Sequence, residues 1–443
     1  MTAIRRSRFG YALIPLFVVL VVVALAFWRG KSPTEGRVEL PFDYRQTAVT
    51  STDNLIDSLQ RQIRENPKDF DAHIELAGTY LQKVRETGDP TLYTKTEDLL
   101  DRARKLQPQS PELFATRGTL ALARHDFAAA LGYGTRALAS DPESARYHSI
   151  VGDAQIELGM YDDAIDSYQE MVNDRPDFSS FSRVAYAREL YGDPEGAIEA
   201  MKFALQAGSG TPENVAWARV QLGNLWFGSG NLEEAEKAYG RSTEAVSAYA
   251  PALAGQAKVA AARGNLEAAS KLYKQAFNRM PLPEYAIALG DVYAEMGDKE
   301  KAETQYEMVR SMDELFRSNG VNTDLEIALF YADHGMDLEA SLQKARAAYE
   351  ARPSIHAADV LAWTLYKSGN SREARKYSEE ALKLGTRDPL KLFHAGMISE
   401  SLGQKEQARK YLQQAIDLNP HFSLLYADEA ADSLKSLKTG GEN

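Results

Sequence analysis

The sharpest break in the pattern of apolar and polar residues lies near the start of the chain. Residues 9–28 contain no charged side chain and consist mainly of Val, Leu, Ala and Phe, which is enough apolar length to cross a bilayer as a helix. Three arginines precede this run, whereas only Arg29 and Lys31 follow it closely. Because the more basic flank stays in the cytoplasm, the pattern predicts a transmembrane signal anchor at 9–28, with residues 1–8 cytoplasmic and the rest of the chain outside.

A cleaved signal peptide is the alternative, since Ala24-Leu25-Ala26 meets the small-x-small rule for cleavage. The run is long for such a peptide, and a bulky Trp28 and two basic residues follow it, which favours a retained anchor. No cysteine occurs in the chain, so a lipid-modified N-terminus is excluded. Residues 29–52, with several Gly, Pro, Ser and Thr, are predicted to be a linker.

Beyond the linker, small residues recur at a fixed phase. Eight times a glycine is followed five residues later by an alanine, and successive glycines are 33 to 38 residues apart. A period of about 34 residues is typical of a helix–turn–helix solenoid. The glycine is expected to end the first helix in a left-handed conformation, and the alanine to let the second helix approach the first. The pairs are Gly159/Ala164, Gly192/Ala197, Gly230/Ala235, Gly264/Ala269, Gly297/Ala302, Gly335/Ala340, Gly369/Ala374 and Gly403/Ala408.

Amphipathic helices are predicted at both ends, because each repeat leaves an apolar face that only a neighbour can cover. In residues 53–66, Asp53 is a plausible N-cap and one face is apolar through Leu55, Ile56, Leu59 and Ile63. In residues 422–438 the apolar side carries Leu424, Leu425, Ala431, Leu434 and Leu437. The sequence therefore predicts one solenoid over 53–438, followed by a disordered tail at 439–443.

The repeats resemble the tetratricopeptide repeat family. Residues 145–176 match that family's register, in which small residues, an aromatic and a proline hold fixed places, through Gly152, Gly159, Ala164, Tyr168 and Pro176. The unit at 111–142 has His125 where the glycine belongs, and the units near 178, 216, 321 and 355 depart most from the register. The resemblance implies an all-α protein, a right-handed α-solenoid of about ten helix pairs, preceded by the transmembrane helix.

The resemblance also implies a concave, peptide-binding groove lined by the first helix of each pair. Exposed rings beside a few charges suit such a groove, because rings supply contact area at low entropic cost. Some members of the family bind a terminal carboxylate with a clamp of Lys and Asn side chains. Only Asn224 and Lys258 partly match that clamp in this sequence. The predicted groove residues are Arg183, Tyr186, Trp217, Asn224, Phe227, Lys258, Asp291, His356, Asp359, Trp363, Tyr366, Phe393 and His394.

Charge and composition narrow the function classes. The chain carries a net charge of −12, and the five charges within residues 1–31 are all basic, so the remainder carries −17. Such a surface repels nucleic acid and suits basic or neutral partners. The absence of cysteine excludes disulfides, thiol catalysis and thiolate metal sites. No phosphate-binding loop, zinc-protease motif or nucleophile elbow is present, so no enzyme activity and no cofactor are expected.

The favoured hypothesis is a non-enzymatic adaptor, anchored in a bacterial cell membrane, that binds partner proteins or peptides in its groove on the extracytoplasmic side during assembly or maturation of envelope components. The alternative is an accessory module that handles a ligand or metal through its C-terminal repeats. There, His334 follows Asp333, and His356 lies three residues before Asp359, a spacing at which a carboxylate and an imidazole could share a metal. Self-association of the repeats is left open.

Overall fold

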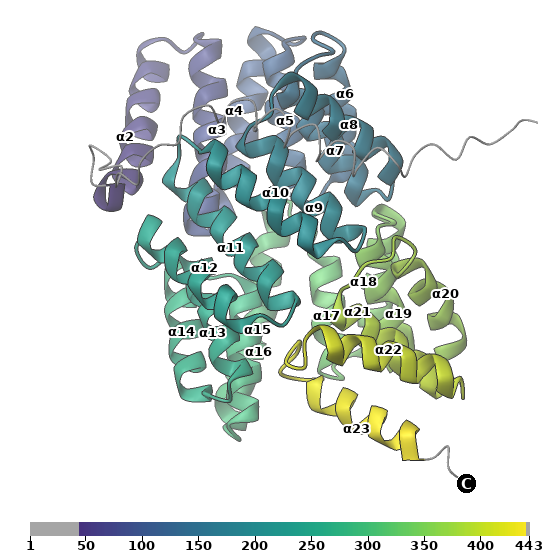
Figure 1. Ribbon diagram of the computed structural model, residues 1–443. Coiled ribbons are helices and arrows are strands. Elements are labelled where there is room, and N and C mark those ends of the chain that lie inside the picture. The colour runs from purple at the N-terminus through teal and green to yellow at the C-terminus, as the bar shows by residue number, and fades with distance from the viewer. Residues whose placement is uncertain (1–43, 440–443) are drawn as a thin grey trace, which may run out of the picture. The chain divides into compact units, whose positions relative to one another are not determined.

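The computed structural model describes residues 44–439 as helices joined by short connections (Figure 1). This part of the chain contains twenty-two helices and no strand. None of these helices is long and apolar enough to cross a membrane. The predicted anchor at 9–28 and its cytoplasmic flank lie outside the described residues.

Twenty of the helices form ten consecutive antiparallel pairs. In chain order the pairs are α3 (Phe70–Thr87) with α4 (Thr91–Leu106), α5 (Pro111–Ala123) with α6 (Phe127–Leu138), α7 (Ala145–Glu157) with α8 (Tyr161–Asp174), α9 (Phe178–Leu190) with α10 (Pro194–Ala207), α11 (Pro212–Gly228) with α12 (Leu232–Ala245), α13 (Ala250–Ala262) with α14 (Leu266–Arg279), α15 (Pro283–Glu295) with α16 (Lys299–Ser318), α17 (Asp324–Asp333) with α18 (Leu338–Ala351), α19 (Ile355–Lys367) with α20 (Ser371–Ala381), and α21 (Pro389–Ser401) with α22 (Lys405–Leu418). We number them pairs 1 to 10. The all-α solenoid of ten pairs is confirmed.

A single helix flanks the pairs at each end: α2 (Tyr44–Glu65) and α23 (Ala427–Thr439). The first begins earlier than the predicted 53–66, because no Gly or Pro interrupts the chain between Pro41 and Pro67. The last begins later than the predicted 422–438, because the chain after Pro420 runs through turns until Ala427. The predicted boundaries at 52 and 422 are therefore wrong, and Leu424 and Leu425 are exposed rather than part of an apolar helix face.

The turn glycines and the buried alanines explain why each pair closes tightly. All eight predicted glycines have positive φ, from 62° to 83°, which a residue with a side chain adopts only at a cost. Seven of the eight predicted alanines are buried, but Ala340 is not. One extra residue before α18, with Asp337 at φ 30°, moves the buried small position to Ser341, whose hydroxyl donates to the carbonyl of Ala328. The prediction for Ala340 is therefore wrong.

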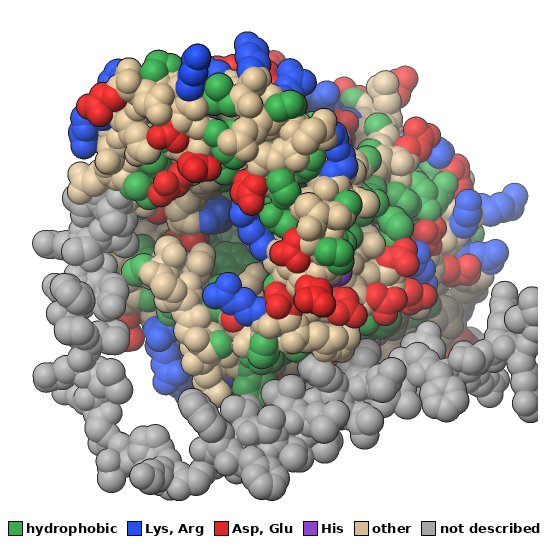
Figure 2. Space-filling view, turned by 90° about the horizontal axis from the view of Figure 1, so that it is seen from above, with side chains coloured by type: hydrophobic (Ala, Val, Ile, Leu, Met, Phe, Trp, Pro, Cys, Tyr) green, Lys and Arg blue, Asp and Glu red, His purple; other side chains and the backbone are tan. Residues whose placement is uncertain are grey.

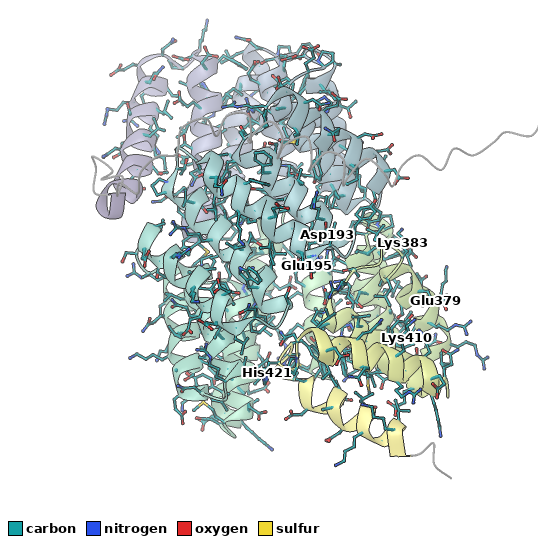
Figure 3. All side chains as sticks on the ribbon, in the orientation of Figure 1. Asp193, Glu195, Glu379, Lys383, Lys410 and His421 are labelled. Carbon is teal, nitrogen blue, oxygen red and sulfur yellow. The ribbon has the colours of Figure 1, made fainter. Side chains whose placement is uncertain are left out.

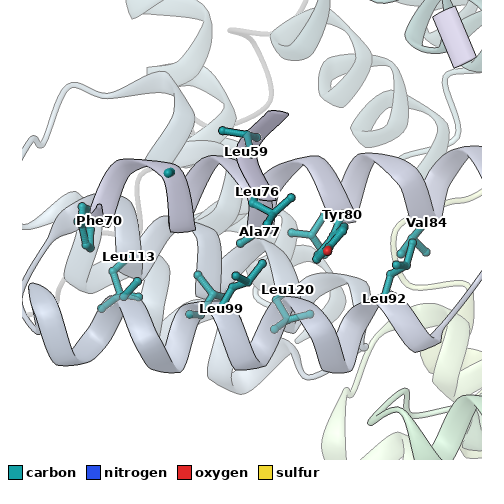
Figure 4. Close-up of a cluster of buried hydrophobic side chains, with 14 residues drawn as sticks. Leu59, Phe70, Leu76, Ala77, Tyr80, Val84, Leu92, Leu99, Leu113 and Leu120 are labelled. Atoms are coloured by element: carbon teal, nitrogen blue, oxygen red, sulfur yellow. The ribbon is translucent and has the colours of Figure 1, made fainter. Parts of the chain in front are cut away.

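Apolar side chains join each pair to the next, so that the core is continuous along the solenoid. In the first cluster, Leu59 of α2, Leu76 of α3 and Leu99 of α4 pack together with Leu113 of α5 (Figure 4). Similar clusters follow along the later pairs, and the last one includes Leu434 of α23. The flanking helices thus cover the apolar faces that the first and last pairs leave open.

The solenoid winds so far that its two halves touch. In each of pairs 1 to 5, the turn between the two helices contacts a loop from the other half of the solenoid. That loop follows the pair that lies five pairs later in the chain. We call these contacts the inter-turn seam. A Cβ at Gly159 would lie 2.4 Å from the carbonyl oxygen of Pro353, and one at Gly192 only 2.1 Å from that of Gly385. The turns and loops of the seam are Gly88 with 280–282, His125 with 320–322, Gly159 with 353–355, Gly192 with 385–387, and Gly230 with 418–419.

Polar contacts reinforce the seam. His125, at φ 59°, holds the place of a turn glycine, and its Nδ1 lies 2.9 Å from the carbonyl oxygen of Asn322. The amide of Ile355 donates to the hydroxyl of Tyr161 at 2.6 Å. Glu195, which accepts from Arg387, lies at the boundary between the two halves together with Lys383 (Figure 3). The winding therefore encloses an interior between the first helices of the two halves.

Candidate functional site

The interior of the superhelix contains three adjoining cavities, with volumes of about 760, 340 and 580 Å³. We call them the first, second and third cavity. Tyr186, Glu189 and Asn224 line both the first and the second, while Lys258 and Phe422 line both the second and the third. The space-filling view shows the described part of the chain hollowed at its centre (Figure 2). The cavities thus form one path, lined mainly by the first helices of the pairs.

The cations of the first cavity are already held by partners. The guanidinium of Arg183 makes two bonds to the carboxylate of Asp153, at 2.6 and 2.7 Å. Buried Arg352 donates to Glu326 at 3.1 Å, and Arg85 lies 3.8 Å from buried Glu213. Glu213 also accepts from the hydroxyl of Tyr249 at 2.8 Å. These interactions fix the walls of the cavity.

Two other carboxylates face this cavity without a cation bound to them. Glu157 accepts only a hydrogen bond from the hydroxyl of Tyr186, at 3.2 Å, and burial raises its pKa. Glu189 makes no hydrogen bond or ion pair, although Lys391 lies near enough to offset part of its shift. It is open to water within the interior, but the surrounding protein and the charge of Asp388 raise its pKa to about 7. Neutral and ionised forms of Glu189 therefore coexist near neutral pH.

The second cavity brings together groups from opposite sides of the seam. The hydroxyl of Tyr186 on α9 lies 3.3 Å from Nε2 of His356 on α19. Burial and the charge of Lys391 lower the pKa of His356 to about 3, so its ring is neutral. The ammonium of Lys391 donates to Asp388 at 2.5 Å. This wall therefore has little free charge.

The third cavity is bounded by Lys258, Asp291 and the connection between α22 and α23. Lys258 is open to water within the cavity, but the surrounding protein desolvates its ammonium and lowers its pKa, and the charge of Glu284 partly offsets this shift. Asp291 accepts from the hydroxyl of Tyr306 at 2.8 Å and lies 2.7 Å from Nε2 of His334. His421 and Phe422 of the connection line the cavity too, and His421 lies between the column of α13 to α16 and helix α22 (Figure 3).

Eight of the thirteen predicted groove residues line these cavities. They are Arg183, Tyr186, Trp217, Asn224, Phe227, Lys258, Asp291 and His356. Their proposed role in binding stays a prediction.

The predicted groove of pairs 9 and 10 is not open, because the chain itself fills it. Trp363 and His394 are 1% exposed and Phe393 is 0% exposed. Tyr426 stacks on Phe393 at 5.0 Å, meets the edge of Trp363 at 5.4 Å, and donates to Asp333 at 2.9 Å. The expected exposure of Trp363, Phe393, His394 and Asp359 is therefore wrong. Tyr366 is half-buried against Trp363 and lines none of the three cavities.

The histidines do not pair with the carboxylates that the spacing suggested for a metal. His334 contacts Asp291, while Asp333 accepts from Trp363 and Tyr426. Asp359 faces His394 at 3.1 Å rather than His356. Within residues 44–439 no three or more His, Asp or Glu side chains converge as metal ligands.

Sequence reasoning missed Glu157 and Glu189, which the geometry brings to the same cavity wall. Glu189 is the twelfth residue of the repeat unit that begins at residue 178. In the family's register, the side chain of the twelfth residue points into the groove. A single glutamate on an acidic chain gave no reason to select it, because most such residues are solvated surface. Glu189 differs from such surface residues because the other half of the superhelix encloses it.

Comparisons with known proteins agree on the repeat family. Models described as tetratricopeptide repeat match residues 116–179, 283–309, 354–387 and 392–422. No curated protein matches the chain.

Among solved structures, the chain is similar to human IFIT1 in a dimer with PPP-AAAA, at 13% identity over 83% of this chain and 94% of that one, with a TM-score of 0.45. It is similar to yeast Tom70 at 13% identity over 89% and 96% of the two chains, with a TM-score of 0.37. It is also similar to PilF of Pseudomonas aeruginosa at 18% identity over 52% and 100%, with a TM-score of 0.36.

Proposed function

Because this chain is a tetratricopeptide repeat protein, we propose that it is a non-enzymatic scaffold that binds a segment of a partner protein inside its superhelix. Repeats of this family form protein-interaction scaffolds, which sets the class of function. The observation that supports the interior as the binding surface is the path of three adjoining cavities. Rings and charged groups line this path, as in sites that recognise peptides.

In this proposal the uncharged residues 9–28 hold the scaffold at the cell membrane, with the repeats on the extracytoplasmic side. The partner would then be an envelope protein undergoing assembly or maturation. Protease added to spheroplasts tests the topology: digestion of the repeats in intact cells supports it, and protection of the repeats contradicts it.

Partner capture from solubilised membranes tests the binding surface. Trp217 and Lys258 are exposed and line different cavities, and the one ring contact of Trp217 is a tilted one with Phe178 at 6.4 Å. We expect Trp217→Ala combined with Lys258→Ala to reduce recovery of the partner at least about tenfold, since ring and charge contacts in such sites contribute about 1–2 kcal/mol each.

The matched control changes an equally exposed apolar and basic pair elsewhere. Leu315→Ala with Lys274→Ala alters side chains on α16 and α14 that line none of the three cavities. Recovery with this variant should equal that of the wild type. Equal recovery with both double variants would show that the partner binds elsewhere.

A further inference from the structure

The first cavity carries an unbalanced set of charges on its wall. Its three arginines are already paired with Asp153, Glu326 and Glu213. Glu157 and Glu189 face the same space without an ion pair. A cation entering the cavity would therefore meet two carboxylates that no ion pair occupies, although Arg352 lies near Glu157 and Lys391 lies near Glu189.

Aromatic rings line the same space. Trp217 is the most exposed of the described tryptophans, at 36%, and its ring lies 6.4 Å from that of Phe178. Tyr186 stands between the two carboxylates, because its hydroxyl donates to Glu157 and Glu189 follows it by three residues on the same face of α9. Apart from this contact with Phe178, the indole is open to a cavity of about 760 Å³.

Rings and carboxylates together favour a planar cation. A guanidinium group can stack on an indole and donate two bonds to a carboxylate at the same time, whereas an ammonium cannot do both equally well. The enclosed position strengthens both interactions, since less water screens them.

We propose that the first cavity is a binding site for an arginine side chain of the partner, with Glu157 and Glu189 accepting its hydrogen bonds and Trp217 stacking on its plane. This site rests on the proposed function, because it specifies which residue of the partner enters the superhelix. The net charge of −17 beyond residue 31 draws such a segment towards the protein.

A pair of synthetic peptides tests the proposal directly. One is an acetylated and amidated octapeptide of alternating alanine and arginine, and the other carries citrulline, the neutral isostere, in place of every arginine. Titration calorimetry on the full chain in detergent should show at least about tenfold tighter binding of the arginine peptide. Equal binding of the two peptides, or binding of neither, overturns the arginine site.

Charge-neutral variants locate the binding. Glu157→Gln with Glu189→Gln keeps the shape of the cavity wall, and a glutamine can still accept from Tyr186. We expect this variant to lose the preference for arginine over citrulline. Glu170→Gln with Glu199→Gln is the matched control, since both glutamates are exposed on the outer helices α8 and α10 of the same two pairs. If the control loses the preference equally, the peptide binds through the overall charge of the protein, and the cavity assignment is wrong.

The failure of this site can be told apart from failure of the proposed function. If Glu157→Gln with Glu189→Gln leaves partner capture intact while Trp217→Ala with Lys258→Ala abolishes it, the interior still binds the partner but without an arginine in the first cavity. If neither variant affects capture, both ideas are wrong.

Discussion

At the scale of single residues, the turn glycines are subject to two different constraints. All have positive φ, but only those of the seam also meet the other half of the superhelix. The Cβ positions of Gly159, Gly192 and Gly230 face backbone there, and that of Gly88 faces side chains of the loop at 280–282. The turn glycines of pairs 6 to 10, from Gly264 to Gly403, have no atom within 4 Å of the place a Cβ would occupy. In pairs 6 to 10 the turn glycine therefore serves only the local turn, whereas in the first half the same repeat position also packs against the other half of the superhelix.

This difference can be measured with two alanine substitutions. Gly369→Ala should cost about 1–2 kcal/mol, the penalty of a side chain in the left-handed region. Gly192→Ala incurs the same penalty and also places its Cβ against the carbonyl of Gly385, which adds about 1–3 kcal/mol of overpacking. Thermal unfolding followed by circular dichroism should show the larger fall in Tm for Gly192→Ala. Equal falls would mean that the seam is not formed in solution.

At the scale of helices, the distance between the two members of a pair depends on one buried small residue. Ala235 on α12 is 0% exposed against α11, whereas Ala340 on α18 is half-exposed because the extra residue before α18 shifts the phase. Pair 8 therefore uses Ser341, which keeps its hydroxyl bonded to Ala328.

Leucine substitutions distinguish the two positions. Ala235→Leu should destabilise the protein by about 1–3 kcal/mol, because the added volume has to separate closely packed helices. Ala340→Leu should change stability by less than about 0.5 kcal/mol, as for a typical surface substitution. Chemical denaturation of the two variants provides the measurement, and a large loss for Ala340→Leu would contradict the shifted phase.

At the scale of the molecule, the seam connects parts of the chain that a one-dimensional solenoid leaves independent. In a simple repeat array each unit contacts only its neighbours. Here the side-chain amide of buried Asn419, after pair 10, donates to the carbonyl of Phe227 in pair 5 at 2.8 Å. A substitution near the end of the chain should therefore lower the local stability of the turn in pair 5.

Hydrogen exchange on Asn419→Ala tests this coupling. The variant also loses the local bond from the amide of His421 to Oδ1 of Asn419. Loss of the bond across the seam to Phe227, about 0.5–1.5 kcal/mol, should speed exchange of the amides around Gly230 by about three- to tenfold. The turn at Gly264 is a suitable internal control, because it lies nearer in sequence but outside the seam. Faster exchange confined to the loop at 419 would show that the two halves are not coupled.

The binding surface illustrates which features required the tertiary structure. The register of the repeats directed Arg183, Tyr186 and Trp217 into the interior, and all three line the first cavity, since a helix periodicity determines which side chains share a face. It failed for Trp363 and Phe393, because Tyr426 from a segment outside the repeats covers them. A register cannot report what another part of the chain places over a surface.

The sequence by itself determined the helix pairs, their number and their turns, because glycines with positive φ and small buried residues act over a few residues and repeat at a constant phase. It also determined the charge and the absence of cysteine chemistry. Only the tertiary structure decided that the two halves meet, which glycines lie in that contact, and which carboxylates face a common cavity. Those features depend on small rotations between successive pairs that accumulate over five pairs, and no single repeat encodes their sum.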